Sequence, residues 1–276
     1  MPTDVKERNN VTVRGEGSQP LLFAHGFGCN QAMWRFVAPH FEATYRTVLF
    51  DYVGSGGSDL SAYDSDRYGS LEGYAQDVLD ICEALALDDV IFVGHSVSTI
   101  IGMLAAIKQP QRFDRLVLIG TSPRYLNDPP DYHGGFERED LDGLLEMMDK
   151  NYIGWSEYFS SLLMQQAEAK EVEDELDRSF CSTDPHIMRE FAEATFFSDY
   201  RDVLPDVLTP VLLVECRHDI IAPMAVTRYV EDHLPDATLT VLDAAGHCPH
   251  LSHPEATKAA IQTYLDDSSS RSSVPA

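Results

Sequence analysis

Six short apolar runs constrain the fold of this 276-residue chain more than any other feature of its sequence. Each run is continuous and rich in Val, Ile and Leu, which is typical of strands buried on both faces of a parallel sheet. Helical periodicity marks residues 71–85, 97–108 and 254–265. The alternation predicts an α/β fold in which helices flank a mostly parallel central sheet. The runs are Pro20–Ala24, Thr47–Phe50, Val90–Val93, Leu116–Ile119, Val211–Val214 and Leu239–Leu242.

The spacing of the runs breaks between Gly120 and Thr209, where no comparable strand candidate occurs. The sequence therefore predicts a helical insertion at residues 123–200, between two parts of one core at residues 1–122 and 201–267. A serine-rich stretch follows, and we expect residues 268–276 to be a disordered tail. Helix-like stretches in the insertion cover residues 137–150, 155–168, 169–180 and 185–197.

The composition is strongly acidic. With 20 Lys and Arg against 45 Asp and Glu, the formal net charge is −25. Nucleic-acid backbones and anionic membranes would repel such a surface, so neither is expected as a partner. Only five of the basic residues are Lys. This bias fits a cytoplasm with very high salt, where ions screen the self-repulsion, and it equally fits an ordinary acidic cytosolic protein.

The cysteines and the N-terminal segment favour a reducing, cytoplasmic location. There are five cysteines and no Cys-x-x-Cys pair, so neither a disulfide framework nor a zinc ribbon is predicted. The first eight residues lack the apolar core of a secretory signal. No apolar run is long enough to span a bilayer as a helix.

The strongest functional motif is Gly94-His95-Ser96-Val97-Ser98, which lies between a predicted strand and a predicted helix. This is the context of a nucleophile elbow, in which a strained turn raises a serine above the sheet edge. Gly94 is the small residue required two positions before the serine. Ser98 replaces the glycine that usually stands two positions after it. The helix N-terminus would favour negative charge near Ser96.

Two further residues complete a candidate catalytic triad with Ser96. Asp219 and His247 follow the last two apolar runs, in the chain order Ser, Asp, His that accompanies this elbow. In such a triad the imidazole takes the serine proton, and the acid orients the imidazole. Asp51 also ends a strand, but it precedes Ser96, so we expect it to anchor a loop.

The backbone amides of Phe27 and Val97 are the candidate oxyanion hole. Phe27 lies in the loop after the first apolar run, and Val97 follows the candidate nucleophile. These are the two positions that supply the donors in such a fold. We expect His25 and His95 to be packing residues, with ordering of the oxyanion loop as the alternative role for His25.

No cofactor and no metal are predicted. The sequence contains no glycine-rich phosphate loop of either standard type. His247, His250 and His253 are close in sequence, but no carboxylate joins them at ligand spacing. Pro249 and Pro254 also prevent the three from sharing one helical face.

Seven motifs carry a resemblance to a known family, and this resemblance covers nearly the whole chain, from about residue 11 to residue 265. They are His25-Gly26-Phe27-Gly28, Phe50-Asp51-Tyr52-Val53-Gly54-Ser55-Gly56, Gly94-His95-Ser96-Val97, Tyr125-Leu126-Asn127-Asp128, Gly134-Gly135-Phe136-Glu137, Asn151-Tyr152-Ile153-Gly154-Trp155 and Gly246-His247-Cys248-Pro249-His250. They resemble the RsbQ family of bacterial α/β hydrolases, to which the plant karrikin and strigolactone receptors are similar. Ser98 matches the plant receptors, whereas glycine is expected there in RsbQ.

The resemblance implies the α/β-hydrolase fold, with the insertion forming a lid of four helices over a small apolar pocket. It also implies a small hydrophobic ligand and, as in RsbQ signalling, a PAS-domain phosphatase as partner. By the same resemblance, the pocket would be lined by Phe27, Phe136, Leu144, Trp155, Phe159, Phe196 and Ile221. For each aromatic, packing of helix on helix is an equal alternative.

The motifs and the resemblance together predict a serine hydrolase that acts slowly on small hydrophobic esters or lactones, including butenolides. One alternative is a signalling receptor that uses the triad to capture a ligand and then engages a protein. Another is a metabolic hydrolase of a different substrate class, such as a C–C bond hydrolase or a perhydrolase. A shared fold and triad do not establish a shared ligand.

Overall fold

A computed structural model describes residues 4–165 and 170–271 of the chain. Over this part, a seven-stranded sheet has the order β1-β3-β2-β4-β5-β6-β7. β1 pairs antiparallel with β3, and the other neighbouring strands are parallel, which confirms the predicted mostly parallel sheet. The strands are β1 (Thr12–Arg14), β2 (Pro20–Ala24), β3 (Arg46–Leu49), β4 (Val90–His95), β5 (Phe113–Ile119), β6 (Val211–His218) and β7 (Ala237–Ala245).

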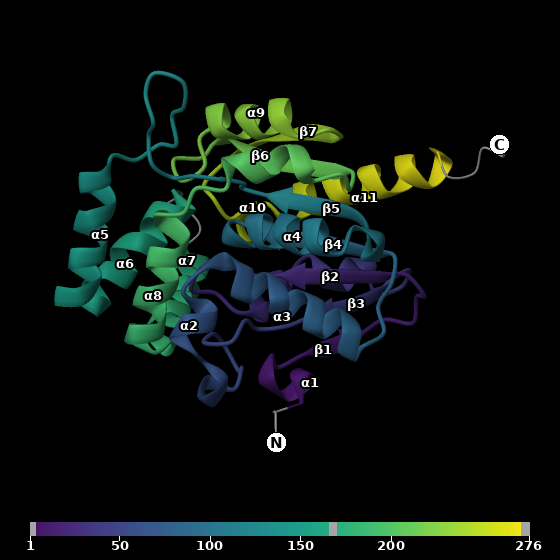
Figure 1. Cartoon of the computed structure of the whole chain (residues 1–276), viewed down its shortest axis with the longest axis horizontal. Helices are drawn as coiled ribbons and strands as arrows, with labels where there is room; N and C mark the ends of the chain where they lie inside the picture. The colour runs from purple at the N-terminus through teal and green to yellow at the C-terminus, as the bar shows by residue number, and fades with distance from the viewer. Residues whose placement is uncertain (1–3, 166–169, 272–276) are drawn as a thin grey trace.

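Helices cover the sheet, and several of them gather at one end of it (Figure 1). In Figure 1, α3 and α4 cross the face of the sheet nearest the viewer, and α5 to α8 lie together at the left. The helices are α1 (Val5–Arg8), α2 (Ser65–Tyr68), α3 (Leu71–Ala84), α4 (Val97–Lys108), α5 (Arg138–Lys150), α6 (Tyr152–Met164), α7 (Lys170–Ser182), α8 (Pro185–Phe196), α9 (Met224–His233), α10 (Pro249–Ser252) and α11 (Pro254–Arg271).

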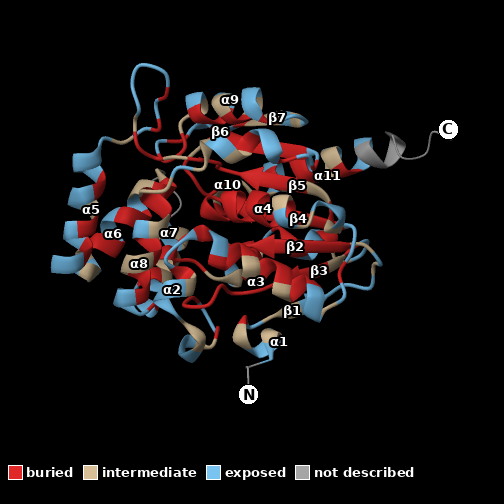
Figure 2. Cartoon of the chain, viewed as in Figure 1, coloured by how far each residue is buried: buried red, intermediate tan, exposed pale blue. Residues whose placement is uncertain are grey.

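The core is centred on β2, β4 and α4. Every residue of β2 and of β4 is buried, as expected for strands covered on both faces. In α4, all ten residues from Val97 to Ala106 are buried, so this helix is enclosed on every side (Figure 2). The first turn of α4 is therefore held rigidly against the sheet.

The strand order brings the predicted site residues to one edge of the sheet. β3 lies on one side of β2 and β4 on the other, so the chain leaves β2 and β4 in opposite directions. Ligands bind parallel sheets at such a switch point, beyond the carboxyl ends of the strands. Ala24 is in register with Gly94, and His218 is in register with Ala245. The loops that follow these strands therefore start side by side in pairs.

The chain between β5 and β6 contains α5 to α8, where the sequence predicts a helical insertion. α5 is amphipathic: Leu141, Leu145 and Met148 are its buried residues, and its outer face is exposed (Figure 2). α6 ends at Met164, followed by Gln165 in the left-handed conformation with φ 49°. The predicted helix at 155–168 extends beyond this point, but residues 166–169 lie outside the described part of the chain.

The C-terminal helix α11 continues to Arg271, four residues into the segment predicted as a tail. Residues 272–276 lie outside the described residues. In the described part of the chain, no helix is both long enough and apolar enough to cross a membrane.

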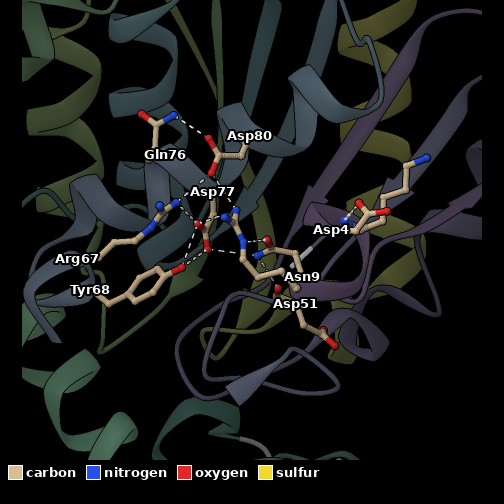
Figure 3. A network of polar contacts seen from close by, with 10 residues as sticks. Asp4, Asn9, Asp51, Arg67, Tyr68, Gln76, Asp77 and Asp80 are labelled. Carbon is tan, nitrogen blue, oxygen red and sulfur yellow. Dashed lines mark hydrogen bonds and ion pairs between the residues drawn. The ribbon is translucent and has the colours of Figure 1, made fainter. Parts of the chain in front are cut away.

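A buried carboxylate ties the N-terminal segment to the core (Figure 3). Asp77 on α3 is fully buried and accepts hydrogen bonds from Arg8 at 3.1 Å, Arg67 at 2.6 Å, Asn9 at 3.2 Å and the Tyr68 hydroxyl at 3.1 Å. These partners come from α1, α2 and the residue that follows α1. The network therefore fastens two four-residue helices, α1 and α2, which bury few side chains of their own, to the longer helix α3.

Asp51 serves as the predicted loop anchor. Its carboxylate accepts hydrogen bonds from the amide of Gln31 at 2.7 Å, the amide of Gly57 at 2.8 Å and the side chain of Asn10 at 2.7 Å. Asn10 and Gly57 lie in loops, and Gln31 begins a short 3-10 helix in the connection that follows β2. This confirms the structural role that chain order indicates for Asp51.

Candidate active site

Ser96 lies on a strained turn between β4 and α4. Its backbone has φ 56° and ψ −122°, which a residue with a side chain adopts only when the surrounding structure enforces it. The amide of Ser96 donates to the carbonyl of Ile119 at 2.8 Å. A Cβ on Gly94 would lie 2.7 Å from the backbone oxygen of Ser98, so glycine is required there. This is the geometry of the predicted nucleophile elbow.

The structure brings the three predicted triad residues together. Ser96 Oγ lies 2.8 Å from His247 Nε2, and His247 Nδ1 lies 2.6 Å from Asp219 Oδ2. Asp219 follows β6 and His247 follows β7, as expected. All three residues are buried, with exposed fractions of 7% for Ser96, 6% for Asp219 and 1% for His247. Water therefore competes weakly for their hydrogen bonds.

The environment of Asp219 fixes which nitrogen of His247 carries the proton. Burial alone would raise the pKa of Asp219, but His247 and the amides of Ala222 and Ile221 hold this pKa below its usual value. The two amides donate to Asp219 Oδ1 at 3.1 Å and 2.7 Å. Asp219 is thus an ionised acceptor, so His247 donates from Nδ1 and accepts the Ser96 proton at Nε2.

His247 is held by both the core and the insertion. Its ring lies over Gly120, where a Cβ would approach His247 Cε1 to 2.8 Å. Its amide donates to the carbonyl of Leu163 on α6 at 2.7 Å. The position of the imidazole therefore depends directly on the C-terminal end of α6.

The two candidate oxyanion amides lie on adjacent loops. Val97 is the first residue of α4, so helix geometry leaves its N–H without a partner inside the helix. Within the described residues, the Phe27 N–H also has no hydrogen-bond acceptor. A Cβ placed on Gly26 would lie only 3.5 Å from Ser96 Cβ, which shows how closely the two loops approach. Both amides are available for an oxygen bound next to Ser96.

Two polar residues near the triad were not predicted as site residues. Burial raises the pKa of Tyr125 to about 12, against the effect of a side-chain hydrogen bond with Ser96. Glu215 on β6 is 1% exposed, and burial followed by the charge of Asp219 raises its pKa well above the usual value. Tyr125 occurs in a motif of the resemblance, but no local pattern marks its role. Glu215 is recognisable only once β6 places it near Asp219.

The remaining histidines near the site are neutral and buried. Burial, together with nearby His247, lowers the pKa of His95 to about 3, and its Nε2 donates to the carbonyl of His247 at 2.8 Å. His250 is fully buried, with its ring 4.7 Å from that of Trp34. In the described part of the chain, neither ring nitrogen of His250 has a hydrogen-bond partner.

One compact group of possible metal ligands occurs in the described residues. Ligand atoms of His95, Cys248 and His250 lie within 4.8 Å of one another. Tetrahedral zinc would need them within about 3.8 Å, and no carboxylate of residues 4–165 or 170–271 joins them. His247 cannot contribute, because Asp219 and Ser96 occupy its two nitrogens. We assign no metal role to the group.

A small apolar cavity lies directly over Ser96 and His247. Its free volume is only about 10 Å³, the volume of roughly one water molecule. Four of the predicted pocket residues line it: Phe27, Phe159, Phe196 and Ile221. The other lining residues, which the sequence did not indicate as pocket positions, include Cys29, Leu163, Thr195 and Cys248.

The other three predicted pocket residues do not line this cavity. Phe136 and Leu144 line a separate groove of about 510 Å³ between α5 and α6, together with Tyr158, Leu162 and Ile220. Trp155 is fully buried and stacks on Phe159 with ring centroids 5.6 Å apart. Trp155 thus packs against neighbouring helices, which is the alternative to pocket lining that the sequence left open. The sequence alone could not assign residues to the cavity or to the groove, because consecutive residues of α6 line different spaces.

Comparison with known proteins decides the family. The family model for the alpha/beta hydrolase fold matches residues 19–254. The chain belongs to the α/β-hydrolase fold family. Among curated relatives of this hydrolase, a probable esterase of Oryza sativa subsp. japonica is 42% identical, over 91% of this chain and 93% of that protein. "Karrikin insensitive 2 receptor CA" of Petunia hybrida is 39% identical, over 91% and 93%.

A solved structure is also similar to this α/β hydrolase over nearly its whole length. The hydrolase olei00960 from Oleispira antarctica is 44% identical, with a TM-score of 0.93, and the match covers 95% of this chain and 96% of that one. The predicted fold class is therefore confirmed. The relatives also agree with the plant-receptor part of the resemblance.

Proposed function

We propose that this hydrolase cleaves small hydrophobic esters or lactones through an acyl-enzyme on Ser96. The observation that carries the proposal is the continuous hydrogen-bond chain from Asp219 through His247 to Ser96, whose side chain lines an apolar cavity. The curated relative named as a probable esterase supports the reaction class. Butenolides are among the lactones that the resemblance favours.

The geometry assigns each group a step. His247 Nε2 takes the Ser96 proton as Oγ attacks the substrate carbonyl. Asp219 stabilises the imidazolium that forms, and the amides of Phe27 and Val97 receive the oxyanion. His247 then gives its proton to the leaving oxygen as the carbon–oxygen bond breaks. Water, deprotonated by the same imidazole, attacks the acyl-enzyme, releases the acid and returns the proton to Ser96.

The lining of the cavity favours a neutral, apolar substrate. Phe27, Phe159, Leu163, Phe196 and Ile221 surround Ser96, and the described residues that line the cavity include no Asp, Glu, Lys or Arg. Residues 121–200, which include α5 to α8, contain 19 Asp and Glu against 6 Lys and Arg. This surplus of negative charge disfavours anionic substrates near the cavity. Equal kcat/KM for matched neutral and carboxylated esters at low salt would contradict this point.

Substrate entry requires α6 to move. A cavity of about 10 Å³ holds no ester, whereas the neighbouring groove measures about 510 Å³. Phe159 and Leu163 face the cavity, and Tyr158 and Leu162 face the groove, so α6 forms the partition. We infer that displacement of α6 joins the two spaces and admits the substrate.

A second candidate function is ligand sensing, in which the hydrolase captures a ligand slowly and then engages a protein. The relative named as a karrikin insensitive receptor favours this alternative. The resemblance to RsbQ supports a PAS-domain phosphatase as the partner. A burst of one product per chain, followed by very slow turnover, would favour sensing. Rapid steady-state turnover on one compound would favour a metabolic hydrolase.

The test of the proposed function is a substrate panel with wild type and Ser96→Ala. We expect wild type to hydrolyse p-nitrophenyl acetate and a butenolide, and Ser96→Ala to lose this activity while it unfolds at the same temperature. Absence of turnover on every ester and lactone, with correctly folded protein, would overturn the proposal. Equal turnover by both proteins would place the chemistry elsewhere.

A further inference from the structure

Ser98 forms an unexpected link between the first turn of α4 and the oxyanion loop. Ser98 Oγ donates a hydrogen bond to the backbone carbonyl of His25, two residues before Phe27. Both Ser98 and His25 are fully buried. Members of this fold with the usual elbow carry glycine at this position and cannot make such a bond. The replacement noted in the sequence therefore adds a specific contact.

Tyr52 extends this link. Its hydroxyl lies 2.8 Å from Ser98 Oγ, and Tyr52 is also fully buried. A serine hydroxyl has one proton, which Ser98 gives to the His25 carbonyl, so Tyr52 must be the donor in its bond to Ser98. The hydroxyl of Tyr52 thereby orients the Ser98 hydroxyl toward the oxyanion loop.

The ring of His25 closes the network. Its Nε2 accepts from the amide of Tyr52 at 3.1 Å, so the proton is on Nδ1, which donates to the carbonyl of Gly26 at 2.8 Å. Burial lowers the pKa of His25, which keeps the ring neutral and this tautomer in place. The carbonyls of His25 and Gly26 are thus both held, immediately before the Phe27 amide.

These contacts tie the loop that carries one oxyanion donor to the helix that carries the other. α4 begins with Val97, one donor, directly after Ser96, and its next residue, Ser98, holds the backbone that leads to Phe27, the other donor. We propose that Ser98, oriented by Tyr52 and assisted by His25, is a positioning residue that aims the Phe27 amide at the oxyanion. The inference rests on the proposed function, because it concerns the same reaction.

The link should act on the transition state rather than on substrate binding. The charged oxygen exists only in the tetrahedral intermediate, so a misaimed amide lowers kcat and leaves KM nearly unchanged. Displacement of a catalytic group by about 1 Å can cost about 100-fold. Loss of the Ser98 hydroxyl should therefore lower kcat by about 10-fold to 100-fold.

The test compares Ser98→Ala and Tyr52→Phe with a matched control, Thr47→Val. The control removes an equally buried hydroxyl on β3, which donates to the carbonyl of Arg14 on the edge strand β1 at 3.2 Å. Steady-state kinetics with p-nitrophenyl acetate and inhibition by phenylboronic acid, which forms a tetrahedral adduct on serine, are measured for each protein, with thermal unfolding alongside.

We expect Ser98→Ala to lower kcat and boronic acid affinity in parallel, with KM within about twofold of wild type. Tyr52→Phe should have a smaller effect of the same kind. The double variant should lose no more than Ser98→Ala, because the two hydroxyls act through one path. Thr47→Val should keep wild-type kinetics.

Two outcomes would overturn the inference. Folded Ser98→Ala and Tyr52→Phe with wild-type kcat and boronic acid affinity would show that the hydroxyls only pack. A loss confined to KM would assign them to substrate binding instead. If wild type itself neither hydrolyses the ester nor binds the boronic acid, the proposed function fails. This result is distinguishable from the two outcomes for the variants, because it is seen in wild type.

Discussion

The triad acid has a buried carboxyl neighbour with the opposite protonation preference. Glu215 accepts hydrogen bonds from the Cys216 amide at 2.9 Å and the Thr227 hydroxyl at 2.8 Å, while its pKa is raised by burial and by the charge of Asp219. The pKa of Asp219 is lowered, since His247 and two amides outweigh burial. The surroundings therefore favour the protonated form of Glu215 and the ionised form of Asp219.

Glu215→Gln should change how stability depends on pH. The raised pKa means that folded wild type retains a proton on Glu215 that the unfolded chain loses above its ordinary pKa of about 4.3. The free energy of unfolding of wild type therefore falls as the pH rises from about 4.3 towards the raised pKa of folded Glu215, by up to about 1.4 kcal/mol per pH unit. Glu215→Gln lacks this contribution. Denaturant unfolding at several pH values between 5 and 8 measures the difference. Parallel stability curves for the two proteins would contradict the assignment.

The sequence identified single residues well where they follow a strand. Ser96, Asp219 and His247 each lie within five residues after the end of an apolar run, and the parallel sheet brings the ends of those runs to one edge. Tyr125 carries no such local signal, and its proximity to the triad depends on how a loop folds over the sheet, which no periodicity records. Glu215 directly follows an apolar run, but the sequence does not show that its carboxyl lies beside that of Asp219.

At the scale of elements, α6 connects the cavity to the catalytic base. Its Leu163 lines the cavity and bonds the His247 amide through the backbone, while Leu162 faces the groove. The helical periodicity predicts α6. It does not predict which side chains of α6 line the cavity and which line the groove, because both spaces have apolar linings. The sequence does not predict the three-residue edge strand β1, because this strand is too short and too exposed to form an apolar run.

Leu163→Ala should widen the acyl site. We expect kcat/KM for p-nitrophenyl butanoate to rise relative to the acetate by about tenfold, the effect of one or two methylenes in an apolar pocket. Leu162→Ala, on the groove side of the same helix, is the control and should leave the ratio unchanged. An equal change in the ratio for both variants would contradict the assignment of Leu163 to the cavity and Leu162 to the groove.

The Asp77 network should stabilise the junction of α1, α2 and α3. Asp77→Ala leaves the guanidinium groups of Arg8 and Arg67 without their buried partner, so we expect a loss of about 3 kcal/mol in the free energy of unfolding. The exposed pair Arg138–Asp142 offers a control, and Asp142→Ala should change stability by less than about 0.5 kcal/mol. Denaturant unfolding measures both losses, and a similar loss in the free energy of unfolding for the two variants would contradict the greater contribution of Asp77.

At the scale of the whole molecule, the net charge of −25 opposes folding through self-repulsion. Salt screens this repulsion, so the melting temperature should rise by at least about 4 °C between low salt and molar KCl. An uncharged osmolyte at matched osmolality is the control, because it stabilises by exclusion without screening. A melting temperature that is constant in KCl would count against salt adaptation.

The central claim is that Ser96 becomes acylated, and mass spectrometry tests it most directly. Wild type, mixed rapidly with p-nitrophenyl acetate and quenched in acid, should gain the mass of one acetyl group, which peptide mapping assigns to Ser96. Ser96→Ala should show no such adduct under the same conditions. Hydrolysis by wild type with the acetyl group on another residue, or with undiminished labelling of Ser96→Ala, would contradict the account.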